Sequence, residues 1–316
     1  MNIFGFLGVP LGFILRLIYS VIQNYGWSLV LFTLITRLIL LPLNFKQQKS
    51  MVQMNLLKPK MDALQKQYGN NKEKYSEETM KLYKKYGISP FSGCLPLLIQ
   101  FPILFALFDV IKRPLKYIWG LSADTCNQVI EAVKATMSPE AISKIPVGYE
   151  ELAATAELVG GKVNEFAQYA INYDFFGLDL SVKPVFDMSA PYFGADWIWI
   201  IPIVAALTTY ISSKFMNIGM DKPKEETNKP KRPPRPGEKA ADENPAGGMM
   251  KVMPFMTLWF TFMMPAGISI YWIAGNIIQI GQQFITNKYY VPKLKERMEQ
   301  EYNEREDNNK KRKNRR

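Results

Sequence analysis

The sequence predicts an all-α, polytopic membrane protein with five transmembrane helices. Two observations indicate this class. Apolar residues gather into long runs that are nearly free of charge, and the loops between these runs alternate between basic and acidic. A soluble domain spreads its apolar residues at the period of a helix or strand, whereas a membrane span needs about 20 largely apolar residues in a row. The near-neutral mean hydropathy of −0.09 averages over these two kinds of stretch.

The apolar runs define the expected order of the elements. The fourth run is short for a span, and its pairing with the fifth supports it, because Pro265-Ala266-Gly267 between them favours a tight turn. The expected elements are an interfacial amphipathic helix (1–26), a first span (27–43), a cytoplasmic helical hairpin (44–89), a second span (90–111), an extracytoplasmic loop (112–196), a third span (197–215), a cytoplasmic linker (216–251), a fourth span (252–267), a fifth span (268–287) and a basic cytoplasmic tail (288–316).

The charges of the loops predict the orientation. Residues 44–89 hold ten Lys and four acidic residues, whereas residues 114–195 hold five Lys and ten acidic residues. Residues 217–248 carry seven Lys or Arg, and the tail carries eleven. Basic segments stay on the cytoplasmic side of a membrane, so the N-terminus is expected outside and the C-terminus inside. The net charge of +11 is then explained without a nucleic acid.

The composition excludes several kinds of active site. The chain contains no His, which excludes Ser-His-Asp and Cys-His catalysis and zinc sites with histidine ligands. Its two cysteines, Cys94 and Cys126, make neither a disulfide framework nor a metal site. No P-loop is present. We therefore expect no enzymatic activity and no cofactor.

The first basic loop, 44–89, is expected to fold as a helical hairpin. Asn70-Asn71 would form the turn, Ser76 would cap the second helix, and Gly87 would end it. The apolar residues of the first helix recur at spacings of three and four: Met51, Met54, Leu57, Met61 and Leu64. The two helices would pack on each other or lie on the membrane surface.

The remaining loops carry little recognisable chemistry. Two helices are expected in the outer loop, near 124–136 and 149–173. The linker around 221–247 is rich in Pro and Lys and is expected to be disordered. The tail ends in a run of Lys and Arg that would bind anionic headgroups or RNA phosphates, or act only as a topological anchor.

Arg37 is the residue that most requires an explanation, because it lies inside the first span. An arginine at the centre of a membrane helix costs roughly 2.5 to 3.5 kcal/mol on insertion scales. Arg37 is six residues from Leu43, or roughly 9 Å along a helix, so its side chain could reach the cytoplasmic headgroups. The alternative is a water-filled cavity that opens to the cytoplasm.

Polar residues on the other spans could line such a cavity. Thr33 shares a helix face with Arg37, whereas Asn276, Gln279 and Gln283 form a stripe on the fifth span. Such a stripe can instead hold helices together. Further polar residues interrupt the second and third spans: Gln100, Thr208 and Thr209. No acidic residue lies in the middle of a span, so Arg37 is free to attract an acidic segment of another chain.

These residues lie in motifs that resemble the YidC/Oxa insertase superfamily. The resemblance is strong in every span except the third, and the segments follow one another in the same order. No large periplasmic domain is expected before the first span, which is similar to the Gram-positive form of the family. The motifs are Thr33-Leu-Ile-Thr-Arg-Leu-Ile-Leu-Leu-Pro-Leu43, Leu57-Lys-Pro-Lys60, Gly93-Cys-Leu-Pro-Leu-Leu-Ile-Gln-Phe-Pro102, Met264-Pro-Ala-Gly-Ile-Ser-Ile-Tyr-Trp-Ile-Ala-Gly-Asn276 and Gln282-Gln283.

The resemblance implies five helices around a hydrophilic groove that opens to the cytoplasm and lipid, in the bacterial plasma membrane. Arg37 matches the groove arginine of the family, and Thr33 matches a groove-lining position. Tyr271 and Trp272 match an aromatic pair near the substrate path, whereas Thr209 stands where relatives often carry Gln. The substrate-binding residues expected from the polar candidates and the resemblance are Arg37, Thr33, Gln100, Thr209, Tyr271, Trp272 and Asn276.

The function that follows is a membrane protein insertase or chaperone for nascent membrane proteins. The expected partners are these clients, the ribosome through the basic tail, anionic lipids, and the Sec translocon as a further candidate. A secondary transporter or channel for a small anion is the alternative, although such proteins usually show repeat symmetry and broken helices in paired positions. A chaperone that holds clients without inserting them needs the same surface, so the sequence does not separate it from an insertase.

Overall fold

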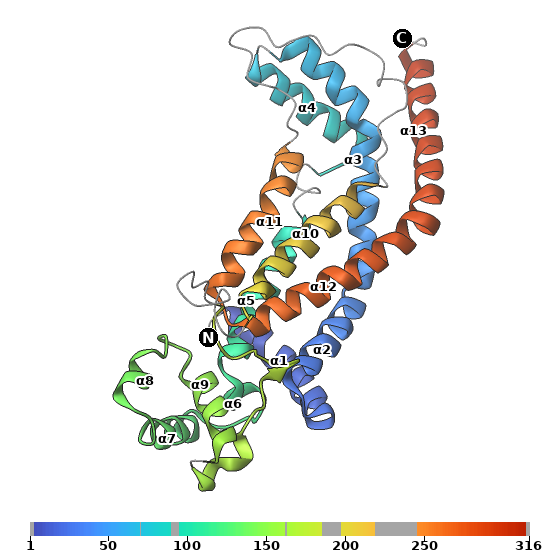
Figure 1. The fold of residues 1–316 in the computed structure, drawn as a ribbon. Coiled ribbons are helices and arrows are strands. Elements are labelled where there is room, and N and C mark those ends of the chain that lie inside the picture. Colours follow the sequence, from blue (N-terminus) through green and yellow to red (C-terminus); the bar gives the residue numbers. More distant parts are fainter. Residues whose placement is uncertain are drawn as a thin grey trace. The chain divides into compact units, whose positions relative to one another are not determined.

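The computed structural model describes residues 3–69, 71–89, 95–161, 163–184, 197–218 and 245–313. Helices make up nearly all of the regular structure there, so the expected all-α class is confirmed for secondary structure (Figure 1). The chain divides into two compact units, which are described separately. The first contains Met1–Ile39, Leu98–Tyr210 and Met253–Ile278, and the second contains Leu40–Leu97, Ile211–Val252 and Gln279–Arg316.

The first unit is built on long apolar helices. Its core contains large side chains with almost no exposed surface, among them Leu15, Tyr25, Phe32, Leu107 and Ile268. The helices that lie wholly or mainly in it are α1 (Ile3–Ile22), α2 (Tyr25–Ile39), α5 (Leu95–Lys112), α10 (Ile200–Ile218), α11 (Pro245–Met263) and α12 (Ala266–Ile285).

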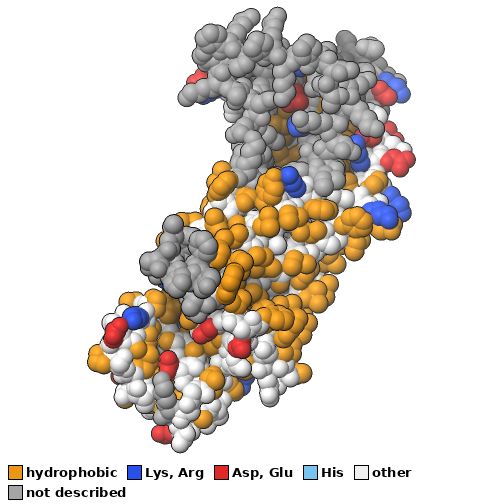
Figure 2. All heavy atoms as spheres, in the orientation of Figure 1, with side chains coloured by type: hydrophobic (Ala, Val, Ile, Leu, Met, Phe, Trp, Pro, Cys, Tyr) orange, Lys and Arg blue, Asp and Glu red, His pale blue; other side chains and the backbone are white. Residues whose placement is uncertain are grey.

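Four of these helices bury small polar side chains beside the apolar core and expose large apolar ones. On α11, Thr257 and Thr261 are buried, whereas Phe255 and Trp259 are exposed. Helices α2, α10 and α12 show the same pattern, with Ser28, Thr33, Thr36, Thr209 and Asn276 buried and Leu34, Leu38, Ile203, Leu207 and Ile277 exposed. Figure 2 shows orange hydrophobic side chains over the region of α10, α11 and α12, with few charged side chains among them.

The first helix of this unit ends earlier than expected. Helix α2 ends at Ile39, and a new helix, α3 (Leu41–Tyr68), begins after Leu40. Pro42 explains the break, because it has no N–H to donate to the carbonyl of Leu38 and its ring clashes there. Arg37 therefore lies in the last turn of α2 rather than six residues from the end of a continuous helix.

The described helices were compared with the length and hydropathy that a membrane span requires. No single helix among them meets the length and hydropathy that a span requires, but α2 and α3 taken together across their break meet both. Three shorter apolar stretches of helix fall below the length requirement: Phe6–Ile22, Ile200–Phe215 and Val252–Met263.

The outer segment that follows α5 contains short helices and one pair of short strands. Ser122 and Ser138 cap α7 and α8 by accepting backbone N–H bonds. The single helix expected near 149–173 is wrong in extent, because Gly161 adopts a left-handed φ of 68° and breaks it. The elements are α6 (Pro114–Tyr117), α7 (Ala123–Lys134), α8 (Pro139–Ser143), α9 (Glu150–Glu157), η2 (Leu158–Gly160), η3 (Asn164–Tyr169) and an antiparallel pair of strands, β1 (Asp174–Phe175) and β2 (Leu178–Asp179).

The second unit contains a helical hairpin made of α3 and α4 (Lys72–Tyr86). Leu57 is buried there with Tyr83 and Tyr86, and Met54 and Met61 pack against them. Gly87 ends α4 in a left-handed conformation, as expected. The expected cap at Ser76 is wrong, because Asn71 accepts the N–H of Lys74 and starts the helix five residues earlier.

The C-terminal tail continues the helical structure. After the π-helical turn η5 (Thr286–Tyr290), α13 (Val291–Lys313) packs against α3 through Val291, Leu294 and Met298. Helix α11 begins at Pro245, inside the segment expected as a linker, because proline suits the first turn of a helix. The rest of that linker, residues 219–244, lies outside the described residues, as do residues 90–94 and 185–196.

Candidate functional site

Four helices of the first unit bring the predicted polar residues into one region. Helix α2 contributes Thr33 and Arg37, α5 contributes Gln100, α10 contributes Thr209, and α12 contributes Tyr271, Trp272 and Asn276. Thr33, Thr209, Tyr271 and Asn276 are buried, while Arg37, Gln100 and Trp272 are partly buried. We call the six residues other than Trp272 the polar cluster.

Arg37 lies against the backbone of α12 at Gly275. A Cβ atom added to Gly275 would lie 3.1 Å from Nη2 of Arg37 and 3.7 Å from the Thr33 methyl carbon. Only glycine therefore leaves full room for the guanidinium at this crossing. Small residues let membrane helices approach closely in the same way. Gly275 was not predicted as a site residue, although the Ala274-Gly275 pair is the sequence signal that could have indicated it.

The charge of Arg37 is not neutralised by a neighbour in the described part of the chain. No carboxylate of the described residues forms an ion pair with it. Its position in the last turn of α2 supplies partial compensation, because the carbonyl end of a helix dipole favours a cation.

Asn276 connects α12 to α10. Its Nδ2 donates to Oγ1 of Thr209 at 2.8 Å and to Oγ1 of Thr208 at 3.1 Å. Thr209 in turn donates to the carbonyl of Ala205 at 2.8 Å. Thr208 therefore joins the cluster beside the predicted Thr209, and the amide of Asn276 holds the two helices together.

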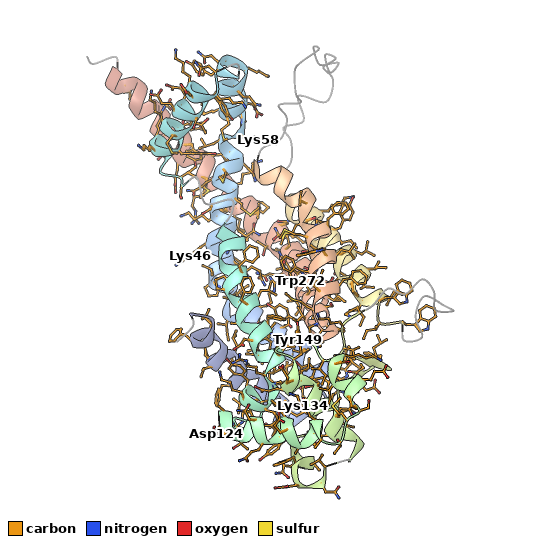
Figure 3. The ribbon with its side chains drawn as sticks, turned by 90° about the vertical axis from the view of Figure 1, so that its left-hand side faces the viewer. Lys46, Lys58, Asp124, Lys134, Tyr149 and Trp272 are labelled. Atoms are coloured by element: carbon orange, nitrogen blue, oxygen red, sulfur yellow. The ribbon has the colours of Figure 1, made fainter. Side chains whose placement is uncertain are left out.

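Tyr271 lies one turn before Gly275 and faces two other helices. Gln100 of α5 donates to its hydroxyl at 3.5 Å, and the ring of Phe32 on α2 lies 6.5 Å away between centroids. The ring of Tyr271 is part of the apolar core of the unit, and Trp272, which Figure 3 labels on α12, packs against that core. The printed contacts thus bring Arg37 and Thr33 together at Gly275, join Asn276 to Thr209, and join Gln100 to Tyr271.

The threonines of α2 satisfy their hydroxyls locally. Thr33 donates to the carbonyl of Leu29 at 2.6 Å, and Thr36 donates to the carbonyl of Phe32 at 3.0 Å. Such bonds within a helix let a hydroxyl be buried without a partner on another helix. Thr33 consequently adds a polar atom beside Arg37 without competing for its guanidinium.

The expected amide stripe continues on the part of α12 that belongs to the second unit. There Gln48 of α3 donates to Gln283 at 2.6 Å, and Gln283 donates to Asn287 at 2.7 Å. Asn287 donates to the carbonyl of Phe215 at 3.2 Å. Of the two explanations for the stripe, these bonds support helix-to-helix hydrogen bonding at both Asn276 and Gln283.

Helices α3 and α4 of the second unit carry ten lysines. Lys46 and Lys58 are exposed on α3, as Figure 3 shows, and Lys84 and Lys85 are exposed near the end of α4. Exposed lysines of this kind attract anionic lipid headgroups electrostatically.

Comparison with known proteins gives consistent matches. A family model described as 60Kd inner membrane protein matches residues 17–294. Membrane protein insertase YidC of Ectopseudomonas mendocina is 28% identical over 284 residues, covering 90% of this chain and 34% of that protein. Membrane protein insertase MisCA of Bacillus subtilis is 28% identical over 268 residues, covering 83% of this chain and 70% of that protein.

The coverage of these relatives is unequal. The chain spans about a third of the length of the YidC insertases that it matches. Among solved structures, a crystal structure of an active YidC insertase with its first transmembrane domain resolved matches with 22% identity and a TM-score of 0.47. That match covers 92% of this chain and 47% of the other.

Proposed function

The chain belongs to the 60Kd inner membrane protein family, and on that premise we propose that it is an insertase and chaperone for nascent membrane proteins in the bacterial plasma membrane. Relatives named membrane protein insertase match along most of the chain, which supports this function. A bond-making activity is not part of the proposal, because the polar cluster contains no pairing of a nucleophile with a base.

The large apolar side chains exposed on four helices of the first unit are the observation that carries the proposal. Large apolar side chains that face outward along four helices would make an aggregation-prone surface in water. In a bilayer the same surface contacts lipid, and buried polar residues form the contacts between helices. This pattern supports helices that contact lipid, and the charges of the loops support the proposed five-span topology with the N-terminus outside.

In the proposed mechanism, the polar cluster faces a hydrophilic groove that clients enter from the cytoplasm and from the lipid. The guanidinium of Arg37 attracts an acidic tail of a client, and the apolar helix of that client slides along the groove into lipid. Burial of the client's own apolar residues and the membrane potential drive completion. The exposed lysines of α3 and the basic tail would hold anionic lipid and ribosomal RNA by charge.

Insertion of a single-span client with an acidic tail into vesicles containing the purified protein tests the proposal. Protection of the translocated tail from added protease measures insertion. Wild type should exceed protein-free vesicles at least tenfold, and Arg37→Ala should lose most of that gain, whereas Arg37→Lys should keep part of it. If wild type performs no better than empty vesicles with several clients, the insertase function is wrong.

A pair of glycine substitutions on α12 isolates the position of Arg37. A Cβ at Gly275 would lie 3.1 Å from Nη2 of Arg37, closer than ordinary contact, so the larger side chain of leucine would displace the guanidinium, whereas a Cβ at Gly281 meets nothing within 4 Å. Gly275→Leu should therefore lower insertion about as much as Arg37→Ala, while Gly281→Leu should leave it unchanged. Equal effects of both substitutions would show that α12 tolerates no side chain at either glycine, and would remove the support for a specific Arg37 site.

A further inference from the structure

The β1–β2 hairpin has an unusual turn. Phe175 pairs with Leu178, so Phe176 and Gly177 form a two-residue loop. Their φ angles are 57° and 78°, which is the conformation of a type I′ turn. The first central position of such turns usually holds Asn, Asp or Gly, because a bulky residue is strained at positive φ. A phenylalanine there indicates that its side chain has a use outside the turn.

The side chain of Phe176 is not used to bury apolar surface inside the chain. It is 79% exposed, although it contacts Phe175 with 4.6 Å between ring centroids. Trp27, itself 50% exposed, lies edge-on to both rings at 5.5 Å from Phe175 and 6.0 Å from Phe176. The three rings form one projecting group, which we call the aromatic tip.

The aromatic tip is fixed to the beginning of α2. A Cβ added to Gly26 would collide with the ring of Phe175, so glycine is what lets the hairpin lie this close to the helix. Asn24 reinforces the contact, because its Nδ2 donates to the carbonyl of Asp174 at 3.4 Å. Trp27 lies in the first turn of α2, so the aromatic tip marks the level at which this helix begins.

We propose that the aromatic tip inserts into the interfacial layer of the bilayer and anchors the hairpin of the outer segment to lipid. This inference rests on the membrane location of α2 that the proposed function assumes. The exposed apolar side of α2 continues from Trp27 through Leu34 and Leu38, so lipid that covers that side reaches the aromatic tip. Aromatic side chains are enriched at the level of the lipid headgroups, because their rings contact lipid while polar groups beside them stay in water.

The charges around the aromatic tip limit its depth. Asp174 and Asp179 are exposed at the base of the hairpin, and they accept hydrogen bonds from the backbone of Gly177 and Ser181. These carboxylates keep the base of the hairpin in water. Because they are negative, the attachment should not require anionic lipid, which distinguishes it from binding by the basic tail.

A second aromatic residue of the first unit, Trp197, also combines a positive φ with an exposed ring. It lies just before α10, has a φ of 53° and is more than half exposed. Strained aromatic residues that project outward near the start of two apolar helices of the same unit agree with contact at an interface between water and lipid.

Nitroxide labels on the full-length protein in phosphatidylcholine vesicles test the proposal. The two native cysteines are replaced by alanine, and single cysteines carry the label at Phe176, at Val147 and at Leu34. Collision with oxygen, which concentrates in lipid, is compared with collision with a water-soluble nickel complex. Val147 is the matched control, because it is an apolar residue of the same outer segment and is 93% exposed. Leu34 reports on the membrane location of α2.

The label at position 176 should collide several-fold more with oxygen relative to nickel than the label at 147 does. It should fall between the labels at 147 and 34. If position 176 is as open to nickel as position 147 while position 34 is protected, the aromatic tip does not enter lipid and the proposed function is unaffected. If position 34 is open to nickel as well, the membrane location of α2 fails, and both proposals fail with it.

A second variant tests the proposal without a label on the turn. Asn is favoured in a type I′ turn, so Phe176→Asn should not lower the midpoint of thermal unfolding in detergent. In phosphatidylcholine vesicles, however, backbone amides of residues 174–179 should exchange with deuterium at least about threefold faster in the variant. Unchanged exchange would overturn the proposal, because it would show that the Phe176 ring does not stabilise the hairpin in vesicles.

Discussion

The helices of the first unit and the helical hairpin of the second differ in the side chains that they expose and bury. On α11, Thr257 and Thr261 are buried and Phe255 is exposed. On the hairpin, Leu57 is buried between α3 and α4, and Lys85 is exposed. Both regions are amphipathic helices at ordinary spacing, so periodicity alone does not distinguish them.

The difference shows which solvent each region folds in. Burying apolar side chains stabilises the hairpin because water is the alternative environment. In lipid that advantage disappears, since lipid tails are as apolar as leucine, and polar contacts and close packing hold helices together instead. The following substitutions break or sharpen this contrast, from the largest expected effect to the smallest.

A lysine introduced at an exposed position should be costly in the first unit and nearly neutral in the hairpin. Phe255→Lys places a cation on the outward face of α11, where the phenylalanine is 75% exposed. This should cost about 3 kcal/mol of insertion free energy if that face contacts lipid. Met80→Lys on α4, where the methionine is 42% exposed, should change stability by less than about 0.5 kcal/mol.

The amount of folded protein recovered from membranes, and its unfolding midpoint in nanodiscs, measure the two effects. Equal tolerance of both lysines would contradict a lipid-facing α11. Equal damage by both would show that the hairpin is not solvated on that side.

Removal of apolar volume should matter most in the hairpin. Leu57→Ala removes a side chain that is almost fully buried among Tyr83 and Tyr86. The expected loss is about 2 kcal/mol, the low end for such truncations, because a two-helix core can partly collapse. Hydrogen exchange of α4 amides should accelerate by roughly tenfold to thirtyfold. Met80→Ala at the surface is the control, and similar acceleration in it would show that the exchange does not report on this core.

Removal of a buried hydrogen bond should matter in the first unit instead. Asn276→Ala removes the donors to Thr208 and Thr209, and it should destabilise the contact between α10 and α12 by about 0.6 to 1.7 kcal/mol. A double-mutant cycle with Thr209→Val isolates the interaction. Additive effects of the two substitutions would show that the 2.8 Å bond contributes nothing measurable.

The smallest effect concerns a carboxylate in the outer segment. Burial raises the pKa of Glu151 above its usual value, although the backbone N–H of Lys116, 3.1 Å away, opposes the shift. Because the folded state holds this proton more tightly than the unfolded state, Glu151 favours folding below the unfolded pKa, and this contribution is lost as pH rises through the folded pKa.

The unfolding midpoint of the outer segment should therefore fall as the pH rises above the ordinary glutamate pKa of about 4.3, and the fall should be smaller in Glu151→Gln. Glutamine keeps an acceptor for the N–H of Lys116, so the comparison isolates the charge. A midpoint with the same pH dependence in both proteins would assign the effect to other groups.

Much of the helical order could be predicted from the sequence, because long apolar runs and loop charges are strong local signals. The turn at Pro265-Ala266-Gly267 and the end of α4 at Gly87 were predicted correctly because Pro and Gly interrupt helices. The end of α2 at Ile39 was missed, since Pro42 was treated as part of the first span although a proline breaks the helix before it.

The candidate site was predictable only in part. Arg37 stands out because a charge in an apolar run is costly, and Thr33 follows from helical spacing. The Ala274-Gly275 pair indicates a close approach of another helix, but the sequence does not say which helix crosses α12 at that point, so the contact with Arg37 was missed. The aromatic tip was missed for a related reason: two-residue strands leave no periodic pattern, and Phe-Gly is not a usual hairpin signal.

The central claim is that Arg37 acts on the charge of the client, and a cycle that varies both partners tests it most directly. Insertion into vesicles is measured for two clients that differ only in whether the tail carries two Asp or two Asn, with wild type and with Arg37→Ala. The predicted result is that the acidic tail inserts several-fold better with wild type and that this advantage disappears in Arg37→Ala. An equal advantage of the acidic tail in both proteins would contradict the claim.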